Sequence, residues 1–213
     1  MTAIVDYGVG NLFSLCCSLK YIGEEASVTS SPDEIMAADR LILPGVGAFG
    51  DAAEKLRETG LDGVVKAFAA TGKPLMGICL GMQLLFDESE EFGLHKGLGL
   101  IPGRVVPIDS LEGWDRRLKI PHIGWNQLKI IKKEPLFANV NDGDCVYFVH
   151  SFCGVGCGEA LAAVTEYGAE ITAAVQLGNV CGCQFHPEKS GQVGLEILRA
   201  FCGISASGGD SPC

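Results

Sequence analysis

Short apolar runs typical of buried β-strands alternate with helical patterns over the first 86 residues of the chain. Leu41-Ile42-Leu43 and Pro74 to Ile78 are apolar throughout, and each is followed by a segment with helical spacing. This alternation is typical of a parallel sheet, because parallel neighbours need a crossover connection that is usually a helix. We therefore expect an α/β fold with a mostly parallel central sheet and helices on both faces.

The spacing of apolar residues gives the bounds of the expected elements. In chain order they are Thr2 to Val5, Asn11 to Ile22, a short helix capped by Ser31, Leu41 to Leu43, Phe49 to Leu56, Leu61 to Ala70, Pro74 to Ile78 and Leu80 to Phe86. Beyond residue 100, β-rich runs follow one another, so we expect hairpins with some antiparallel pairing there. These runs are Arg104 to Ile108, Leu128 to Ile131, Val146 to His150, Leu161 to Thr165, Ile171 to Gln176 and Val180 to Phe185, before a last helix from Gly191 to Cys202.

Composition narrows the class of protein. With 213 residues, of which 47% are hydrophobic, we expect one folded domain over residues 1–204 and a disordered Ser/Gly/Pro-rich tail over residues 205–213. The net charge of −10 disfavours nucleic acid and anionic lipid as partners. The first residues carry no basic stretch, and no apolar run reaches the roughly 18 residues of a membrane span. We expect a cytoplasmic protein.

The chain has ten cysteines, and those in apolar runs are expected to be reduced thiols, given the absence of a signal peptide pattern. Five of them stand in apolar runs and are expected to behave as small hydrophobic residues: Cys16, Cys17, Cys79, Cys145 and Cys202. The pairs Cys153/Cys157 and Cys181/Cys183 raise the alternative of a four-thiolate zinc site. Neither pair has the C-x-x-C spacing of such sites, so no metal is predicted.

One cysteine stands where a nucleophile is expected. In Gly77-Ile78-Cys79-Leu80-Gly81, Cys79 lies between a buried strand and a helix, with a glycine two positions away on each side. A sharp strand-to-helix turn would hold the thiol out of the sheet, and the glycines allow the close packing that this turn needs. The helix N-terminus favours the thiolate, and the amide of Leu80 could face an oxyanion. A buried structural cysteine at a tight crossover is the alternative.

Gln184-Phe185-His186-Pro187-Glu188 can supply the base that a cysteine nucleophile needs. In an extended segment His186 and Glu188 project from one face, so the carboxylate can orient the imidazole while the imidazole moves the thiol's proton. His95 and His122 are expected to be structural or exposed to solvent, whereas His150 is a candidate for the wall of the site.

Pro44-Gly45-Val46-Gly47, after the Leu41 to Leu43 strand, is a flexible turn with backbone amides available for an oxyanion hole. Gly8-Val9-Gly10 raises the alternative of dinucleotide binding. That motif lacks its third glycine, where Phe13 stands, and no acidic ribose partner follows it.

Together these motifs resemble those of the class I glutamine amidotransferases. Gly77 to Gln83, which reads Gly-Ile-Cys-Leu-Gly-Met-Gln, and His186-Pro187-Glu188 carry the resemblance. It implies a flavodoxin-like amidotransferase fold and a Cys-His-Glu triad that hydrolyses glutamine to glutamate and ammonia, without a cofactor.

Four further segments resemble one branch of that family, the glutaminase subunits of imidazole glycerol phosphate synthases. They are Ile4 to Leu12, the PGVGAFG turn from Pro44 to Gly50, Pro121 to Asn126 and Tyr147 to Phe152. Phe152 departs from the Tyr of the family's His-Ser-Tyr, which removes any hydroxyl there but leaves backbone contacts. The resemblance implies a heterodimer with a (β/α)8-barrel cyclase subunit that receives the ammonia and forms imidazole glycerol phosphate in histidine biosynthesis.

The resemblance also assigns roles to individual residues. Cys79 is the nucleophile, His186 the general base and acid, and Glu188 its orienter, with the amides of Val46 and Leu80 as the oxyanion hole. The expected contacts to glutamine are Gly45, Gly47, Gln83, Ser151 and Phe152. The expected partner interface is Asn11, Trp125, Asn126, Tyr147 and Lys189. Such glutaminases stay weak until the cyclase site is filled, and a Gly45–Val46 peptide that reorients would explain this. For Trp125 the alternative to an interface role is ordinary core packing.

Three other functions remain open. They are a glutaminase subunit of a different amidotransferase, a stand-alone γ-glutamyl cysteine hydrolase, and a non-catalytic binding module on the same scaffold. Activity without a partner would favour the hydrolase.

Overall fold

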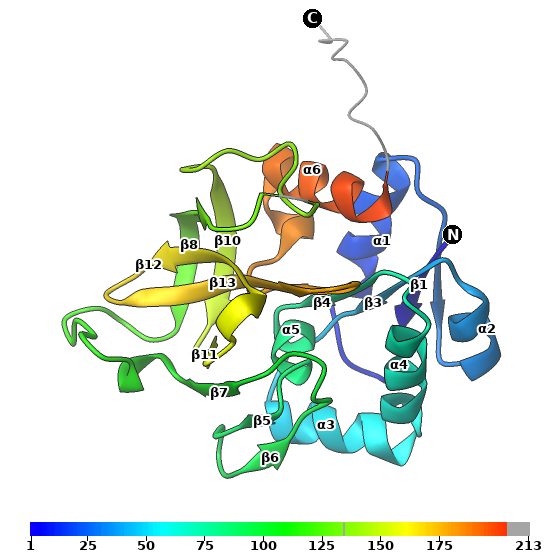
Figure 1. Cartoon of the computed structure of the whole chain (residues 1–213), viewed down its shortest axis with the longest axis horizontal. Helices are drawn as coiled ribbons and strands as arrows, with labels where there is room; N and C mark the ends of the chain where they lie inside the picture. Colours follow the sequence, from blue (N-terminus) through cyan, green and yellow to red (C-terminus); the bar gives the residue numbers. More distant parts are fainter. Residues whose placement is uncertain (134, 204–213) are drawn as a thin grey trace, which may run out of the picture.

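A computed structural model describes residues 1–133 and 135–203 of the chain (Figure 1). Its largest sheet has eight strands in the order β2-β1-β3-β4-β14-β13-β12-β9. The first five of these pair in parallel: β2 (Ala26–Thr29), β1 (Thr2–Val5), β3 (Arg40–Leu43), β4 (Leu75–Ile78) and β14 (Val180–Cys183). The predicted α/β class with a mostly parallel sheet is confirmed for this part of the sheet.

Helices cover both faces of the parallel strands (Figure 1). One face carries α1 (Leu12–Tyr21) and α6 (Gly191–Cys202). The other face carries α2 (Pro32–Ala37), α3 (Phe49–Glu58), α4 (Leu61–Ala70) and α5 (Leu80–Leu84). The Ser31 hydroxyl accepts a hydrogen bond from the Glu34 amide, as the predicted cap requires.

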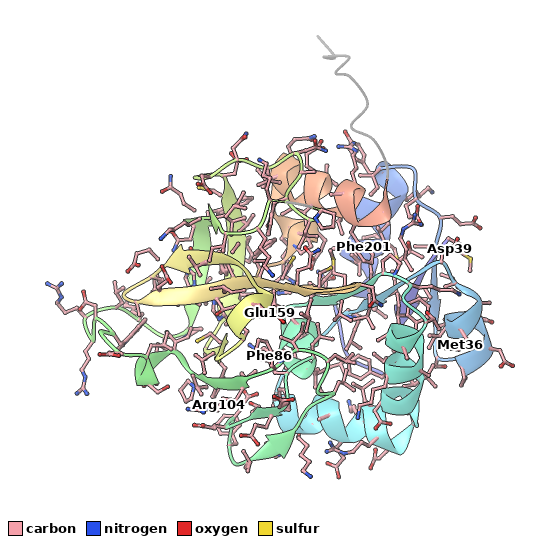
Figure 2. The ribbon with its side chains drawn as sticks, viewed as in Figure 1. Met36, Asp39, Phe86, Arg104, Glu159 and Phe201 are labelled. Atoms are coloured by element: carbon pink, nitrogen blue, oxygen red, sulfur yellow. The ribbon has the colours of Figure 1, made fainter. Side chains whose placement is uncertain are left out.

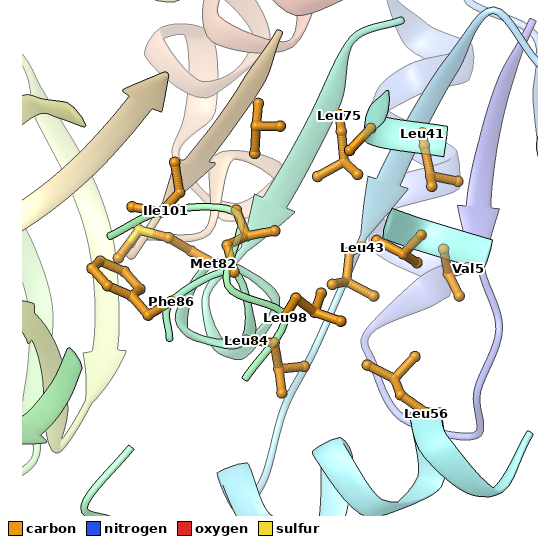
Figure 3. Close-up of a cluster of buried hydrophobic side chains, with 14 of the residues drawn as sticks. Val5, Leu41, Leu43, Leu56, Leu75, Met82, Leu84, Phe86, Leu98 and Ile101 are labelled. Carbon is orange, nitrogen blue, oxygen red and sulfur yellow. The ribbon is translucent and has the colours of Figure 1, made fainter. Parts of the chain in front are cut away.

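The core lies in two layers because strand side chains alternate between the two faces. Leu41 and Leu43 pack toward α3 and α5, in the cluster that Figure 3 shows with Leu56 and Met82. Ile42, between them, packs toward α1 and α6. Each layer is therefore built from apolar side chains of the same few strands.

Antiparallel strands extend the sheet in the second half of the chain. They are β13 (Glu170–Leu177), β12 (Leu161–Glu166) and β9 (Lys129–Ile130). β8 (His122–Gln127) and β10 (Cys145–His150) form a separate antiparallel pair. A third sheet holds β11 (Phe152–Val155), β7 (Arg104–Pro107), β5 (Glu88–Ser89) and β6 (His95–Lys96). Three short 3-10 helices also occur in the chain: η1 (Ile108–Ser110), η2 (Gly158–Ala160) and η3 (Pro187–Lys189). The predicted antiparallel pairing in this half is confirmed.

Individual side chains are buried or exposed according to their place in these layers. Phe86 lies in the interior, whereas Asp39 and Arg104 lie at the surface (Figure 2). Cys17 and Cys145 are exposed, so the expectation that they behave as buried hydrophobic residues is wrong. Cys17 lies on the outer side of α1, and Cys145 is the first residue of β10, where an apolar sequence neighbourhood does not bring burial.

The nine cysteines within the described ranges are all free thiols. In the same ranges, no group of three or more His, Cys, Asp or Glu residues is placed to hold a metal ion. No helix among the described residues is long and apolar enough to cross a membrane. The expected tail at residues 205–213, and its boundary with the domain, lie outside the described residues.

Candidate active site

Cys79 stands at the turn between β4 and α5 with φ of +54° and ψ of −111°. A positive φ is costly for a residue with a side chain, and it persists where the surrounding structure enforces it. The Cys79 amide donates to the Cys183 carbonyl at 2.7 Å. A Cβ at Gly81 would collide with the carbonyl of Leu43, and one at Gly77 would lie 2.6 Å from the carbonyl of Gly81. The two glycines of the motif are therefore what lets this turn close.

His186 and Glu188 meet beside Cys79. The His186 Nδ1 lies 2.8 Å from the Glu188 Oε1, and both side chains are 3% exposed. The expected extended geometry is wrong, because β14 ends at Cys183 and Glu188 lies in the 3-10 turn of η3. The carboxylate reaches the imidazole because the chain turns after His186, whose amide is held by the Tyr147 carbonyl at 3.0 Å.

The charge state of His186 follows from its contacts. Burial alone would lower the pKa of the imidazole, but hydrogen bonds to Cys79 and Glu188 outweigh it and raise the pKa to about 9. At neutral pH the ring is therefore a cation between a carboxylate and a sulfur atom. A charged imidazole in this place can give a proton to a leaving group.

A cleft of about 430 Å³ opens over this group. The predicted site residues that line it are Val46, Gly47, Cys79, Leu80, Gln83, Ser151, Phe152, His186 and Lys189. Glu188 and Asn11 instead line a much smaller cavity of about 10 Å³ behind the histidine. Most of the residues singled out from the sequence are thus brought to one place, although they come from segments far apart in the chain.

The glycine turn lies on the side of the cleft that faces α5. Gly45 is buried, and a Cβ there would lie 2.8 Å from the Gly81 amide nitrogen and 2.9 Å from the Tyr7 hydroxyl oxygen. Gly45 therefore lies behind the cleft and does not line it. Val46 is 40% exposed at the cleft, and Gly47 has a φ of +98°. Within the described residues, the amides of Val46 and Leu80 donate to no protein atom.

Gln83 has one free hydrogen-bonding atom to offer a ligand. Its Nε2 donates to the Phe152 carbonyl at 2.9 Å and to the Gln184 Oε1 at 3.0 Å. Both amide hydrogens are therefore used inside the protein, which fixes the side chain. Only its Oε1 remains as an acceptor.

Sequence reasoning missed Glu91 and Phe92, which also line the cleft. Glu91 is 8% exposed, and its Oε2 accepts the Phe49 amide at the start of α3 at 2.6 Å. Burial raises the pKa of this carboxyl. Phe92 has a φ of +52° and meets the Phe152 ring edge-on with 6.2 Å between centroids. Glu91 stands among other acidic residues in sequence, so no local pattern distinguishes it.

Three of the predicted interface residues, Trp125, Asn126 and Tyr147, lie on the β8–β10 pair, whereas Lys189 lies in η3 and Asn11 directly precedes α1. Trp125 is 57% exposed and meets Tyr147 edge-on at 6.1 Å, with the Lys189 ammonium 5.9 Å from the Tyr147 ring centre. Core packing of Trp125 is therefore wrong. Asn126 points to the opposite face, where its Nδ2 donates to the Glu166 carbonyl at 2.9 Å.

Comparison with known proteins shows the family of this chain. Residues 3–203 match the family model described as glutamine amidotransferase class-I. The imidazole glycerol phosphate synthase subunit HisH of Bacillus licheniformis is 52% identical over 202 residues, which cover 94% of this chain and 95% of the relative. The subunit of the same name from Wolinella succinogenes is 47% identical over 96% of this chain and 100% of its own length.

Solved structures share the fold. A structure of PurLQS from Thermotoga maritima superimposes with a TM-score of 0.74 at 23% identity, over 95% of this chain and 97% of that chain. A crystal structure of a glutamine amidotransferase gives a TM-score of 0.73 at 21% identity, over 96% and 99% of the two chains. The chain therefore belongs to the class I glutamine amidotransferases and, within them, to the family of imidazole glycerol phosphate synthase HisH subunits.

Proposed function

We propose that Cys79, His186 and Glu188 hydrolyse L-glutamine to glutamate and ammonia, and that the chain passes this ammonia to a (β/α)8-barrel cyclase subunit. One observation carries the proposal. A cysteine at a strained strand-to-helix turn and a buried histidine held by a carboxylate both lie at a cleft of about 430 Å³. Membership of the HisH family supports the same reaction.

In the first half of the reaction the Cys79 thiolate attacks the carboxamide carbon of glutamine, and the carbonyl oxygen becomes an oxyanion. We assign the free amides of Val46 and Leu80 to this oxyanion, because both residues line the cleft next to the nucleophile. Protonated His186 gives its proton to the leaving nitrogen. Ammonia departs, and the γ-glutamyl thioester of Cys79 remains.

In the second half a water molecule cleaves the thioester. Neutral His186 takes a proton from the water as its oxygen attacks the thioester carbon, and the carbon–sulfur bond breaks. This step releases glutamate and restores the thiolate and the imidazolium. Glu188 holds the ring through Nδ1, which leaves Nε2 as the atom that gives and takes the proton in both halves.

The cleft offers a partner for each polar group at the amino-acid end of glutamine. The buried carboxylate of Glu91 can take the α-ammonium, since it is an anionic wall of the cleft. We propose Gly47, Ser151 and Phe152 as further contacts, with the Gln83 Oε1 as an acceptor. Gly45 acts indirectly, because its lack of a side chain lets the turn pack against Gly81.

A second active site must receive the ammonia, because ammonia released into water is protonated and diluted. The exposed patch of Ile123, Trp125, Tyr147 and Lys189 is our candidate surface for the cyclase subunit. Aromatic residues are enriched at such interfaces. Lys189 also lines the cleft, so this patch borders the place where ammonia forms.

The test is glutamate release from glutamine by the purified chain, first alone and then with a cyclase subunit that carries its ribotide ligand. Cys79→Ala is the blank. Strong stimulation by the liganded partner, absent in the blank, supports the proposal. High activity of the lone chain without stimulation would instead favour a stand-alone hydrolase or a subunit of another amidotransferase.

A further inference from the structure

Four residues beside the cleft form an unbroken series of hydrogen bonds that the proposed reaction does not use. The Asn126 Nδ2 lies 3.4 Å from the His122 Nε2. The His122 Nδ1 lies 3.0 Å from the His150 Nε2, and the His150 Nδ1 lies 2.9 Å from the Phe152 carbonyl oxygen. The series runs from the inner face of β8 to the cleft wall, where His150 and Phe152 both lie.

Both ends of this series fix its direction. The Asn126 Nδ2 also donates to the Glu166 carbonyl, so it is the amide nitrogen and can only donate to His122. At the other end the Phe152 carbonyl can only accept, so His150 carries its proton on Nδ1. His122 must then donate from Nδ1 to the His150 Nε2. Both rings are neutral Nδ1–H tautomers, because a proton added to Nε2 of either ring would place an N–H donor opposite another N–H donor.

The surroundings hold the rings in this state. His122 is 2% exposed and is stacked between Tyr167 and Phe148, with centroid distances of 4.0 and 4.7 Å. Burial lowers the pKa of His122 to about 4. Burial is also the main cause that lowers the pKa of His150 to about 3, and the neighbouring His122 and His186 add to it. A ring that is packed between two aromatic faces keeps a fixed orientation, so a displacement of its strand also displaces its hydrogen-bond partner.

The two ends of the series touch different parts of the molecule. Along β8, His122 and Asn126 alternate with Ile123 and Trp125, whose side chains are exposed on the opposite face. At the cleft, the Phe152 carbonyl accepts a second hydrogen bond from Gln83. A shift of β8 therefore displaces the rings, and the rings hold the carbonyl that orients a cleft residue.

We propose that Asn126, His122 and His150 form a directional relay through which β8 positions Phe152 and Gln83 for glutamine binding. His122 and His150 are then positioning residues, and neither touches the reacting atoms. The inference rests on the proposed glutaminase function for its kinetic consequence, whereas the tautomers and the coupling can be measured without activity. Because β8 also carries Trp125, the relay connects the candidate partner surface to the substrate.

The first test is nitrogen NMR of histidine-labelled full-length chain at pH 7, with His122→Phe and His150→Asn for assignment. The expected result is Nδ1–H and bare Nε2 for both rings. A protonated Nε2 on either ring would overturn the relay. This outcome does not depend on whether the chain hydrolyses glutamine, so failure of the relay and failure of the proposed function are distinguishable.

The second test separates the relay from local packing. His122→Phe keeps the stacking but removes both hydrogen bonds, and His150→Asn keeps a donor for Phe152 but not the acceptor for His122. In complex with the liganded cyclase subunit, each variant should raise KM for glutamine about tenfold and change kcat less than about twofold, since a lost partner leaves a buried group unsatisfied. The double variant should be no worse than either single variant. Wild-type KM in His150→Asn, or additive effects, would refute the relay.

The matched control is Gln127→Ala, which alters the exposed neighbour of Asn126 on the same strand. It should leave KM for glutamine unchanged, both alone and when it is combined with His122→Phe. If His122→Phe does not fold, Asn126→Ala replaces it, because it removes the first donor from a half-buried position. Calorimetric binding of glutamine to each variant in a Cys79→Ala background should show the same loss of affinity as the KM values, and unchanged affinity would count against the relay.

Discussion

The hydroxyl of Tyr7 donates a hydrogen bond to the Pro44 carbonyl, 2.7 Å away, at the start of the turn that carries Val46. Tyr7 is 5% exposed, and burial raises the pKa of its phenol, so the donor keeps its proton. Pro44 directly follows β3, and Gly45 packs against the same hydroxyl. Tyr7 thus holds one end of the turn, while Val46 at its other side faces the cleft.

We expect Tyr7→Phe to loosen this turn. The ring stays, but the Pro44 carbonyl loses its partner, which should lower the free energy of unfolding by about 1 kcal/mol. An oxyanion donor is worth about 100-fold or more in kcat, so partial misplacement of the Val46 amide should lower kcat about tenfold and leave KM nearly unchanged. Steady-state kinetics and urea unfolding measure both. Tyr21→Phe, at an exposed position, is the control, and an unchanged kcat in Tyr7→Phe would contradict this role for the turn.

Replacement of Glu91 by glutamine should weaken substrate binding. The amide retains an oxygen for the Phe49 amide but has no charge for the α-ammonium of glutamine. We expect KM to rise about tenfold or more, with a smaller change in kcat. An analogue of glutamine without the α-amino group should bind wild type and Glu91→Gln equally.

The neighbouring Glu90 provides the control, because its carboxylate is half exposed and pairs with Arg104 at 3.1 Å. Glu90→Gln should leave KM for glutamine unchanged. If Glu90→Gln and Glu91→Gln raised KM alike, the effect would come from general charge at this loop rather than from a contact in the cleft.

The sequence allowed prediction of the parallel strands and of the elbow at Cys79, because both depend on local pattern. Leu41 to Leu43 is apolar on both faces, and two glycines flank the cysteine at fixed spacing. His186 and Glu188 do meet, but a 3-10 turn brings them together and not the extended segment that the sequence suggests. The side chains of two residues at this spacing can meet in an extended segment or in a 3-10 turn.

Tertiary structure decides the remainder of the site. Glu91 reaches the cleft from the segment between β5 and β6, and its acidic neighbours mask it in sequence. Gly45 is needed for close packing against Gly81, which sequence alone does not distinguish from flexibility. For this reason Gly45→Ala is a poor test of a reorienting Gly45–Val46 peptide, because the added methyl group would strain the elbow itself.

The elbow glycines should tolerate no side chain. A Cβ at Gly81 would collide with the Leu43 carbonyl, which is backbone and cannot move aside. We expect Gly81→Ala to lower the free energy of unfolding by about 3 kcal/mol or more and to abolish glutaminase activity. Gly63→Ala is the matched control, since nothing lies within 4 Å of its added Cβ on the exposed side of α4. It should raise stability by up to about 1 kcal/mol, and equal losses in the two variants would refute the steric account.

Stability should fall at both ends of the pH range for different reasons. The pKa of His186 is raised from 6.5 to about 9, so its bonds to Cys79 and Glu188 contribute fully below pH 6.5 and are lost as the pH rises through about 9. The pKa values of His122 and His150 are lowered to about 4 and about 3. Their contribution is present above pH 6.5 and is lost as the pH falls toward those values, because the unfolded rings take up protons first.

Urea unfolding across this pH range should separate the two effects. His186→Gln should remove the part of the alkaline decline that lies between pH 6.5 and about 9 and leave the acid decline in place. Above about pH 9 a decline should persist in both proteins, because burial raises the pKa of thiols such as Cys153 and Cys181. His122→Phe should reduce the acid decline and leave the alkaline one, since it removes a buried ring that must stay neutral. One pKa unit is worth about 1.4 kcal/mol, so the contribution of His186 should be about 3 kcal/mol, and that of His122 and His150 together should be up to about 8 kcal/mol. A decline between pH 6.5 and 9 that survives unchanged in His186→Gln would show that another group, and not the histidine of the site, sets stability in this range.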